Sequence, residues 1–475
     1  MAEAKNQLIR GLTLTDTTAL VIGTVIGTGV FLKAAVMSQE VGTPTLVMLA
    51  WVAAGVLSLA GALTYAELGA MLPEAGGEYV YLKHSYGEAS AFLFGWQRFI
   101  VAGSASIAAL GAGLAVFLSA FLPLSTVWAE SKFRFLGQDI NWQFGSKQLV
   151  AVGVILLLTA INCLTVAFGG KVQSLLTVLK LAGIAFIIGG VFIASKTANW
   201  SNIFSPYLGQ GPEREGLGML SAFGVAMLAA LWGYDGWNNM PMAAGEVQNP
   251  GRNIPRALIV GMIVVMAIYC LLNLAYFYAL PFGEVLTSNS NAHRNALPVS
   301  AKAAGTFLGE FGGRFVSVIF VVSALGALNG SILSNARVPY AMARDGMFFP
   351  AMGELSRKTH VPIKGLLVQG VWASVLALSG TFDQLTDCLL FASWIFYGLV
   401  TSSVFVLRRK MPDTARPYKT FGYPLIPIVF VIVAIALIFN TLYQRPVESV
   451  VGLGLIVIGL PLYYYFRARQ RASVS

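Results

Sequence analysis

Two stretches of the sequence place glycines and polar side chains inside long apolar runs. The first reads Ile22-Gly23-Thr24-Val25-Ile26-Gly27-Thr28-Gly29-Val30-Phe31, and the second reads Leu231-Trp232-Gly233-Tyr234-Asp235-Gly236-Trp237-Asn238-Asn239, followed by Pro241. A glycine in a helix costs about 1 kcal/mol relative to alanine, so both patterns predict an interrupted helix. An interruption frees backbone N–H and C=O groups, which are costly in hydrocarbon unless a polar ligand or water meets them.

The freed groups have opposite polarity on the two sides of a break. The N–H groups near Gly27, Thr28 and Gly29 would lie at the positive end of a helix dipole, which favours a carboxylate. Carbonyls on the other side favour an ammonium, namely those near Ile22, Gly23, Trp232 and Gly233. An α-amino acid carries both groups on one carbon, so the pattern predicts an amino acid site. The residues expected to form it are Ile22, Gly23, Ile26, Gly27, Thr28, Gly29, Trp232, Gly233, Asp235, Trp237 and Asn238.

Some of these residues have a second interpretation. Gly23 and Gly27 also form a Gly-x-x-x-Gly face, which is typical of close helix packing in membranes. Asp235 is either a substrate or gating contact or the cap of the helix that follows it. Asn238 either hydrogen-bonds the substrate or caps the same helix.

Ionisable side chains inside apolar runs form the next group of candidates, because each costs at least about 2.5–3.5 kcal/mol in lipid. Lys180 lies mid-run with no acidic residue within one turn, so it either holds a fixed charge or carries a proton. Glu67, Glu246 and Arg337 lie near the ends of runs, where we expect a gate or structural ion pairs. Arg98 lies early in its run, and we expect its side chain to snorkel to the membrane interface.

The composition places these residues in a membrane protein. The chain has 475 residues, of which 56% are hydrophobic and only 11% are charged. A soluble protein has about 25% charged residues, so lipid must be part of the solvent here. The formal charge of +10 lies mostly in short loops, where it sets membrane orientation rather than recognising nucleic acid.

Apolar runs of roughly 20 residues predict an all-α integral membrane protein, since such a length crosses the hydrocarbon core. We expect twelve transmembrane helices, at 14–38, 44–71, 88–121, 148–166, 171–194, 216–245, 257–280, 313–343, 364–380, 385–407, 421–442 and 446–466. The two broken runs are the first and the sixth. This spacing favours an inverted repeat of 14–194 and 216–407, followed by two further helices at 421–466.

Lys and Arg favour one side of this arrangement by roughly two to one, which predicts that both termini are cytoplasmic. Residues 1–13 and 467–475 are then cytoplasmic tails, and no cleavable signal peptide is visible. Cys163, Cys270 and Cys388 each lie in an apolar run without metal-ligand spacing, so we expect reduced thiols and no metal site.

Two other classes of membrane protein are disfavoured. An enzyme needs a nucleophile, a metal or an acid–base set, whereas His84, His293 and His360 lie in three separate loops without a catalytic motif. A channel typically shows a filter motif or rings of charge, and neither is present. We therefore expect no cofactor and no catalytic residue.

The chain resembles the amino acid–polyamine–organocation superfamily, and within it the L-type amino acid transporters. The resemblance rests on motifs in order along the first eight runs: Gly23 to Phe31, Tyr65-Ala66-Glu67-Leu68-Gly69, Gly76-Gly77-Glu78-Tyr79, Val172-Gln173 with Lys180, Tyr234 to Asn238, Glu246 with Asn249-Pro250, Asn329-Gly330-Ser331, and Arg337. It implies a leucine-transporter-type fold of five plus five helices with helices 1 and 6 broken. It also implies Na⁺-independent transport of amino acids across the plasma membrane, often by exchange, with neutral and small substrates expected here.

The resemblance assigns further roles. It places Lys180 against the broken first helix and the eighth helix, where sodium-coupled relatives bind Na⁺, so the ammonium replaces that ion. Animal L-type transporters bind a heavy subunit through a cysteine after the third helix, whereas this chain has no cysteine between Leu122 and Cys163, so we expect no disulfide-linked partner. Some relatives have glycine at the position of Asp235, which leaves a cationic or proton-coupled permease as the alternative.

Overall fold

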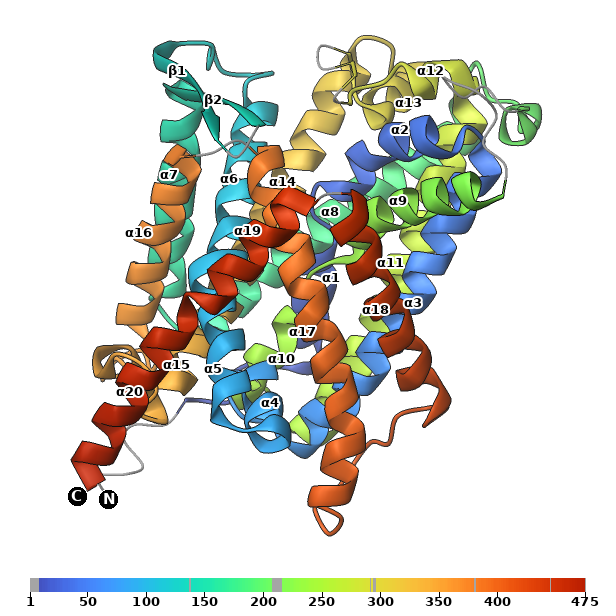
Figure 1. The fold of residues 1–475 in the computed structure, drawn as a ribbon. Coiled ribbons are helices and arrows are strands. Elements are labelled where there is room, and N and C mark those ends of the chain that lie inside the picture. Colours follow the sequence, from blue (N-terminus) through green and yellow to red (C-terminus); the bar gives the residue numbers. More distant parts are fainter. Residues whose placement is uncertain are drawn as a thin grey trace.

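The structure, a computed structural model, describes residues 8–135, 138–206, 216–290, 292–293, 296–379, 382–444 and 446–474. Figure 1 shows long helices packed side by side, with a two-stranded hairpin at one end of the molecule and the end of the last helix at the other. The chain is therefore a helical protein with one small sheet outside the helical body.

The elements of the first half are, in chain order, α1 (Leu14–Val25), α2 (Gly29–Val41), α3 (Pro44–Met71), α4 (Glu78–Tyr86), α5 (Glu88–Trp96), the π-helix η2 (Gln97–Ala102), α6 (Gly103–Leu118), β1 (Val127–Phe135), β2 (Gln138–Gly145), α7 (Ser146–Asn162), α8 (Val166–Ala194) and the 3₁₀-helix η3 (Trp200–Phe204). The second half contains α9 (Leu217–Tyr234), α10 (Asn239–Met242), η4 (Ala244–Glu246), α11 (Pro250–Ala279), α12 (Phe282–Leu286), α13 (Val299–Leu308), α14 (Phe311–Asn335), α15 (Arg337–Arg344), η5 (Pro350–Gly353), α16 (Ile363–Ser379), α17 (Phe382–Lys410), α18 (Leu425–Gln444), α19 (Pro446–Val457) and α20 (Gly459–Val474).

Each predicted transmembrane segment contains at least one helix. Within the described residues, eight helical segments are long and apolar enough to cross a membrane, and α7, α9 and α16 are shorter apolar helices. The chain is therefore a multi-pass membrane protein. The count of twelve crossings and the five-plus-five repeat remain predictions.

Both predicted helix breaks are present. α1 ends at Val25 and α2 begins at Gly29, while α9 ends at Tyr234 and α10 begins at Asn239. Gly236 in the second break has a φ of 113°, and a Cβ there would lie 2.8 Å from the backbone oxygen of Thr24. Only glycine fits this position, because it combines a positive φ with close contact to another backbone. The Thr24 hydroxyl also donates to the Gly236 carbonyl at 2.9 Å, which joins the two breaks directly.

Several helix boundaries differ from the predicted ones. α8 begins at Val166 rather than at 171, because the Thr165 side chain caps it by accepting from the Phe168 N–H at 3.2 Å. α11 begins at Pro250 rather than at 257, since proline loses no hydrogen bond at the first helical position. The predicted segment 313–343 is two helices, with Ala336 between α14 and α15.

The helical body is as predicted, and the loop after the third predicted segment adds a small sheet that the prediction did not include. β1 and β2 pair there as an antiparallel hairpin. Lys132, Phe133, Arg134 and Phe135 alternate polar and apolar residues with the period of a strand, a signal that the sequence analysis did not use. The Trp142 indole N–H donates to the Leu378 carbonyl at 2.8 Å, which ties the hairpin to the end of α16.

The broken helices lie at the centre of the helical body. α1 packs against α8, α11 and α14, while α2 packs against α9. In the most apolar window of 14–41, 83% of the residues are buried, compared with 22% in the corresponding window of α18. The breaks are therefore enclosed by protein, whereas α18 presents most of its surface outward.

Candidate functional site

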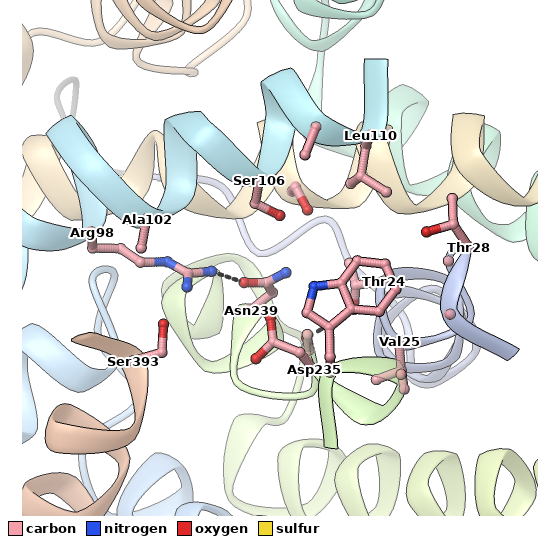
Figure 2. A pocket seen from close by; sticks show the side chains of 17 residues that line it. Thr24, Val25, Thr28, Arg98, Ala102, Ser106, Leu110, Asp235, Asn239 and Ser393 are labelled. Carbon is pink, nitrogen blue, oxygen red and sulfur yellow. Dashed lines mark hydrogen bonds between the residues drawn. The ribbon is translucent and has the colours of Figure 1, made fainter. Parts of the chain in front are cut away.

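The two breaks line a common cavity with a volume of about 60 Å³. At roughly 10–15 Å³ for each water molecule, it holds about four to six waters or a solute of similar size. The lining residues come from the two breaks, the third predicted segment, α14 and α17: Thr24, Val25, Gly27, Thr28, Gly29, Arg98, Ala102, Ser106, Ala109, Leu110, Trp232, Gly233, Asp235, Gly236, Asn239, Ser331 and Ser393. Figure 2 shows Thr28 at one end and Arg98 with Ser393 at the other.

The Thr28 end of the cavity offers hydrogen-bond donors. α2 begins at Gly29, and the Phe31 N–H donates to the Thr28 carbonyl at 3.3 Å, while the N–H groups of Gly29 and Val30 precede the first carbonyl that the helix could offer them. Thr28 precedes it without capping it, and its buried hydroxyl has no hydrogen-bond partner within the described part of the chain. Together with the positive end of the helix dipole, this arrangement suits an anion such as a carboxylate.

The carbonyls expected to meet an ammonium already accept hydrogen bonds. Ile22 accepts from the Ile26 N–H at 2.9 Å, and Trp232 accepts from the Asp235 N–H at 3.3 Å. The Gly233 carbonyl accepts from the Tyr269 hydroxyl at 2.8 Å. A carbonyl oxygen has two lone pairs, so an ammonium at these positions would use the second one.

The remaining carbonyl, that of Gly23, accepts a hydrogen bond from Lys180. Its buried ammonium donates to Gly23 at 2.9 Å, to Ile26 at 2.6 Å and to Ser323 of α14 at 3.0 Å. An ammonium has three N–H donors and a neutral amine has two, so three carbonyl acceptors match the charged form. Gly326 makes room for this side chain, since a Cβ there would lie 3.0 Å from Nζ. Lys180 thus joins α8 to the first break and to α14.

The structure divides the eleven predicted site residues into two groups. Six line the cavity, namely Gly27, Thr28, Gly29, Trp232, Gly233 and Asp235. The other five, Ile22, Gly23, Ile26, Trp237 and Asn238, are not among its lining residues. Gly23 serves packing instead, because a Cβ there would lie 2.0 Å from the Gln173 amide. Trp237 and Asp235 line a second cavity of about 10 Å³, on the α17 and α18 side.

The expected snorkelling of Arg98 was wrong. Its side chain is 6% exposed and lines the cavity. It donates from Nε to the Asn335 side-chain oxygen at 2.8 Å and from Nη2 to the Asn239 side-chain oxygen. Arg98 lies on the π-helix η2, a local rewinding that occurs often at functional sites and reorients the side chains on either side of it. The polar partners Asn239 and Asn335 were the signal that sequence reasoning missed.

A buried polar network lies beside the second break. Tyr397 of α17 donates to Asp235, and the Asn238 amide donates to Glu78 Oε2 at 3.2 Å. Tyr65 donates to the other Glu78 oxygen at 2.8 Å. Glu78 is fully buried and begins α4, so this network links the break to the segment between two candidate membrane spans.

The predicted gate residues form ion pairs away from the cavity. Arg337 donates to both Glu246 oxygens, at 2.7 and 2.9 Å, and both side chains are at most 1% exposed. Glu67 accepts from Arg408 at 2.7 and 2.9 Å. The Leu12 N–H donates to the Glu246 carbonyl at 2.9 Å, so the segment before α1 pairs with the residues after the second break.

Comparison with known proteins identifies the family. The amino acid permease family matches residues 12–463. The chain belongs to this family. It is 33% identical to the serine/threonine exchanger SteT of Bacillus subtilis, over 95% of both chains. It is 31% identical to the b(0,+)-type amino acid transporter 1 of Mus musculus, over 96% of this chain and 88% of the relative, and 29% identical to the human cystine/glutamate transporter, over 98% and 86%.

These relatives confirm the resemblance seen in the sequence, and they are transporters rather than enzymes. Of the three cysteines, Cys163 and Cys270 are free and half-buried, while the side chain of Cys388 lies outside the described residues. The cavity at the two breaks lies inside the helical body and is the candidate substrate site.

Gly27 provides a direct test of the cavity. A Cβ at Gly27 would lie 3.7 Å from Ala327 and Leu110, so Gly27→Ala fits, whereas Gly27→Leu extends into the cavity. We expect Gly27→Leu to lower uptake of radiolabelled amino acid in proteoliposomes by roughly 100-fold or more, as expected when a binding site is filled. Gly27→Ala should lose less than about tenfold by the same reasoning.

Melting temperature in detergent controls for folding of both Gly27 variants. Normal transport by folded Gly27→Leu would exclude this cavity as the site. Gly29 is a poorer test position, because a Cβ there would lie 2.7 Å from the Cα of Gly233 and would disturb packing directly.

The buried carboxyl of Glu78 should make the free energy of unfolding depend on pH. Burial raises the pKa of the Glu78 carboxyl from 4.5 to about 7. Above pH 4.5 the unfolded chain loses this proton first, so the folded state loses stability as the pH rises from 4.5 to 7 and then levels off. Glu78→Gln removes the titration, so its melting temperature should rise relative to that of the unmodified protein between pH 5 and pH 8. Glu74→Gln, at an exposed position, should show no such difference. If the melting temperatures of Glu78→Gln and of the unmodified protein differ by the same amount at every pH from 5 to 8, the raised pKa of Glu78 is contradicted.

Proposed function

We propose that the protein exchanges small neutral amino acids across the membrane by alternating access, without sodium. The observation that carries this proposal is the cavity between the two broken helices, with the N-terminus of α2 at one end and a Thr28 hydroxyl that has no partner among the described residues. These donors suit the α-carboxylate of an amino acid. SteT, a related exchanger of serine and threonine by name, supports exchange as the transport mode.

The size and lining of the cavity favour small side chains that are neutral and polar. About 60 Å³, enough for about four to six water-sized groups, is filled by the backbone of an amino acid and a side chain of about one or two non-hydrogen atoms. Hydroxyl-bearing residues line it, namely Thr24, Thr28, Ser106, Ser331 and Ser393. Serine and threonine are therefore the first candidates, because a site with hydrogen-bonding groups disfavours ligands that leave them unpaired. Asp235 supports a cationic permease as the alternative, but Arg98 lines the same cavity and opposes it.

Lys180 supports sodium independence. Its ammonium contacts carbonyls of the first break and of α14, as a bound cation would. A fixed charge held by three carbonyls favours a static role over a proton carrier, since loss of the proton would leave one acceptor facing a lone pair. The lysine then holds the break in place in every step of the cycle.

The remaining features fit a plasma-membrane exchanger with both termini in the cytoplasm. The bias of Lys and Arg supports this orientation. In this proposal the buried pair of Glu246 and Arg337 holds the inner side closed, and its opening releases substrate; the ion pair at 2.7 Å supports this role. The function requires the lipid bilayer and an amino acid substrate, and no disulfide-linked heavy subunit is expected to take part.

Counterflow in liposomes tests the proposed function. Uptake of radiolabelled serine by the purified protein should require an unlabelled amino acid inside the vesicles. Serine and threonine should compete at least roughly tenfold better than leucine or arginine, as expected for a small polar site. Replacing Na⁺ with choline should leave uptake unchanged. Uptake into empty vesicles driven only by an inward proton gradient would support proton coupling instead, and a strict sodium requirement would contradict the proposal.

Removal of the buried ammonium tests the role of Lys180. Lys180→Ala removes the ammonium donor from the carbonyls of Gly23, Ile26 and Ser323, of which Ile26 still accepts from the Ser323 hydroxyl. A buried acceptor that loses its donor costs about 1–3 kcal/mol. We expect exchange to fall by roughly 100-fold or more, with a smaller loss of inserted protein. Lys171→Ala, at an exposed position of the same helix, is the matched control. Exchange that persists in Lys180→Ala, with or without a pH gradient, would remove the lysine from the mechanism.

A further inference from the structure

Two side chains of opposite charge line the cavity away from Thr28. Arg98 reaches it from η2, and Asp235 reaches it from the break between α9 and α10 (Figure 2). Both lie inside the helical body, where an uncompensated charge is costly. Their contacts therefore decide which ligands the cavity accepts.

Neither charge is satisfied by the other. The Asn239 and Asn335 side-chain oxygens accept from Arg98, and these bonds use two of its five N–H donors. Asp235 accepts from the Tyr397 hydroxyl and from the Gly236 N–H, which takes two of about four acceptor positions on a carboxylate. Counting only the described residues, both groups keep hydrogen-bonding capacity for a ligand, and their opposite charges attract one another, with the buried Glu78 carboxyl close enough to interact with both.

Such a pair discriminates by charge. A cationic side chain is attracted to Asp235 but repelled by Arg98. An anionic side chain is attracted to Arg98 but repelled by Asp235. A neutral hydroxyl or amide can donate to the carboxylate and accept from the guanidinium, so it satisfies both. The charges of Arg98 and Asp235 offset one another only while both residues are present.

We propose that Arg98 and Asp235 form the side-chain subsite and that their opposite charges restrict transport to neutral amino acids. The proposal rests on the proposed function and adds the residues that set its charge class. Neutralising one member should therefore switch the accepted class toward the charge of the member that was removed. Neutralising both should restore selection for neutral substrates.

Exchange measured in proteoliposomes of the full chain tests this with labelled threonine, arginine and glutamate. Relative to threonine, Arg98→Gln should raise arginine uptake at least roughly tenfold, and Asp235→Asn should raise glutamate uptake by a similar factor, since each leaves one uncompensated charge. Arg98→Gln combined with Asp235→Asn should return both ratios toward those of the unmodified protein. Lys171→Gln and Glu74→Gln, which remove exposed charges of each sign, should change neither ratio.

Binding provides a readout that does not depend on transport. The rise in melting temperature caused by each amino acid should follow the same order, so failure of exchange alone refutes the proposed function and leaves the subsite testable. If Arg98→Gln does not fold, Arg98→Lys should keep the preference for threonine, and Asp235→Asn remains the deciding variant. Unchanged preferences in Asp235→Asn, or a shift of both single variants toward the same charge class, would overturn the proposal.

Discussion

The need to satisfy backbone polar groups at two breaks inside apolar helices governs the rest of the structure. In hydrocarbon an unpaired C=O or N–H is costly, so side chains from neighbouring helices must reach the breaks. Ser323 donates to the carbonyls of Ile26 and Gly27, at 2.8 and 2.9 Å. Tyr269 of α11 bridges the carbonyls of Val25 and Gly233. These bonds hold both breaks in one geometry, and within the described part of the chain they leave the Thr28 hydroxyl without a partner at the proposed carboxylate end of the cavity.

Buried charge is handled in three different ways. Lys180 is held by backbone carbonyls alone, Glu246 and Arg337 hold one another, and Glu78 is held by a tyrosine and an asparagine. A buried ion pair contributes little net stability, but removing one partner is strongly destabilising because it strands the other. These arrangements therefore specify where the helices must lie more than they strengthen the fold. Arg98 and Asp235 differ from all three, since their charges face a cavity.

The sequence predicted the features that local chemistry determines. Glycine spacing around Gly27 and Gly236 marked both breaks, and the length of the apolar runs located the helices, although α8 and α11 begin five and seven residues before their predicted starts. It missed Arg98, Ser323, Tyr269 and Tyr397, each of which reaches the breaks from another helix. Helices that are apolar on every side carry no periodic signal for which face turns inward. The position of Lys180 against the first break came from the family resemblance, since nothing local to Lys180 indicates its acceptors.

The pairing of Leu12 with the backbone at Glu246 and Gln248 has a mechanical consequence. Only Thr13 separates this pairing from α1, and Thr13 is itself fixed as the cap of that helix. The segment before α1 is thus joined to the end of η4 and the residues after it, and the end of α1 is joined to the second break where Thr24 meets Gly236. Because both connections would have to break before α1 could separate from the chain around α10, we expect these two parts to move together as one rigid unit.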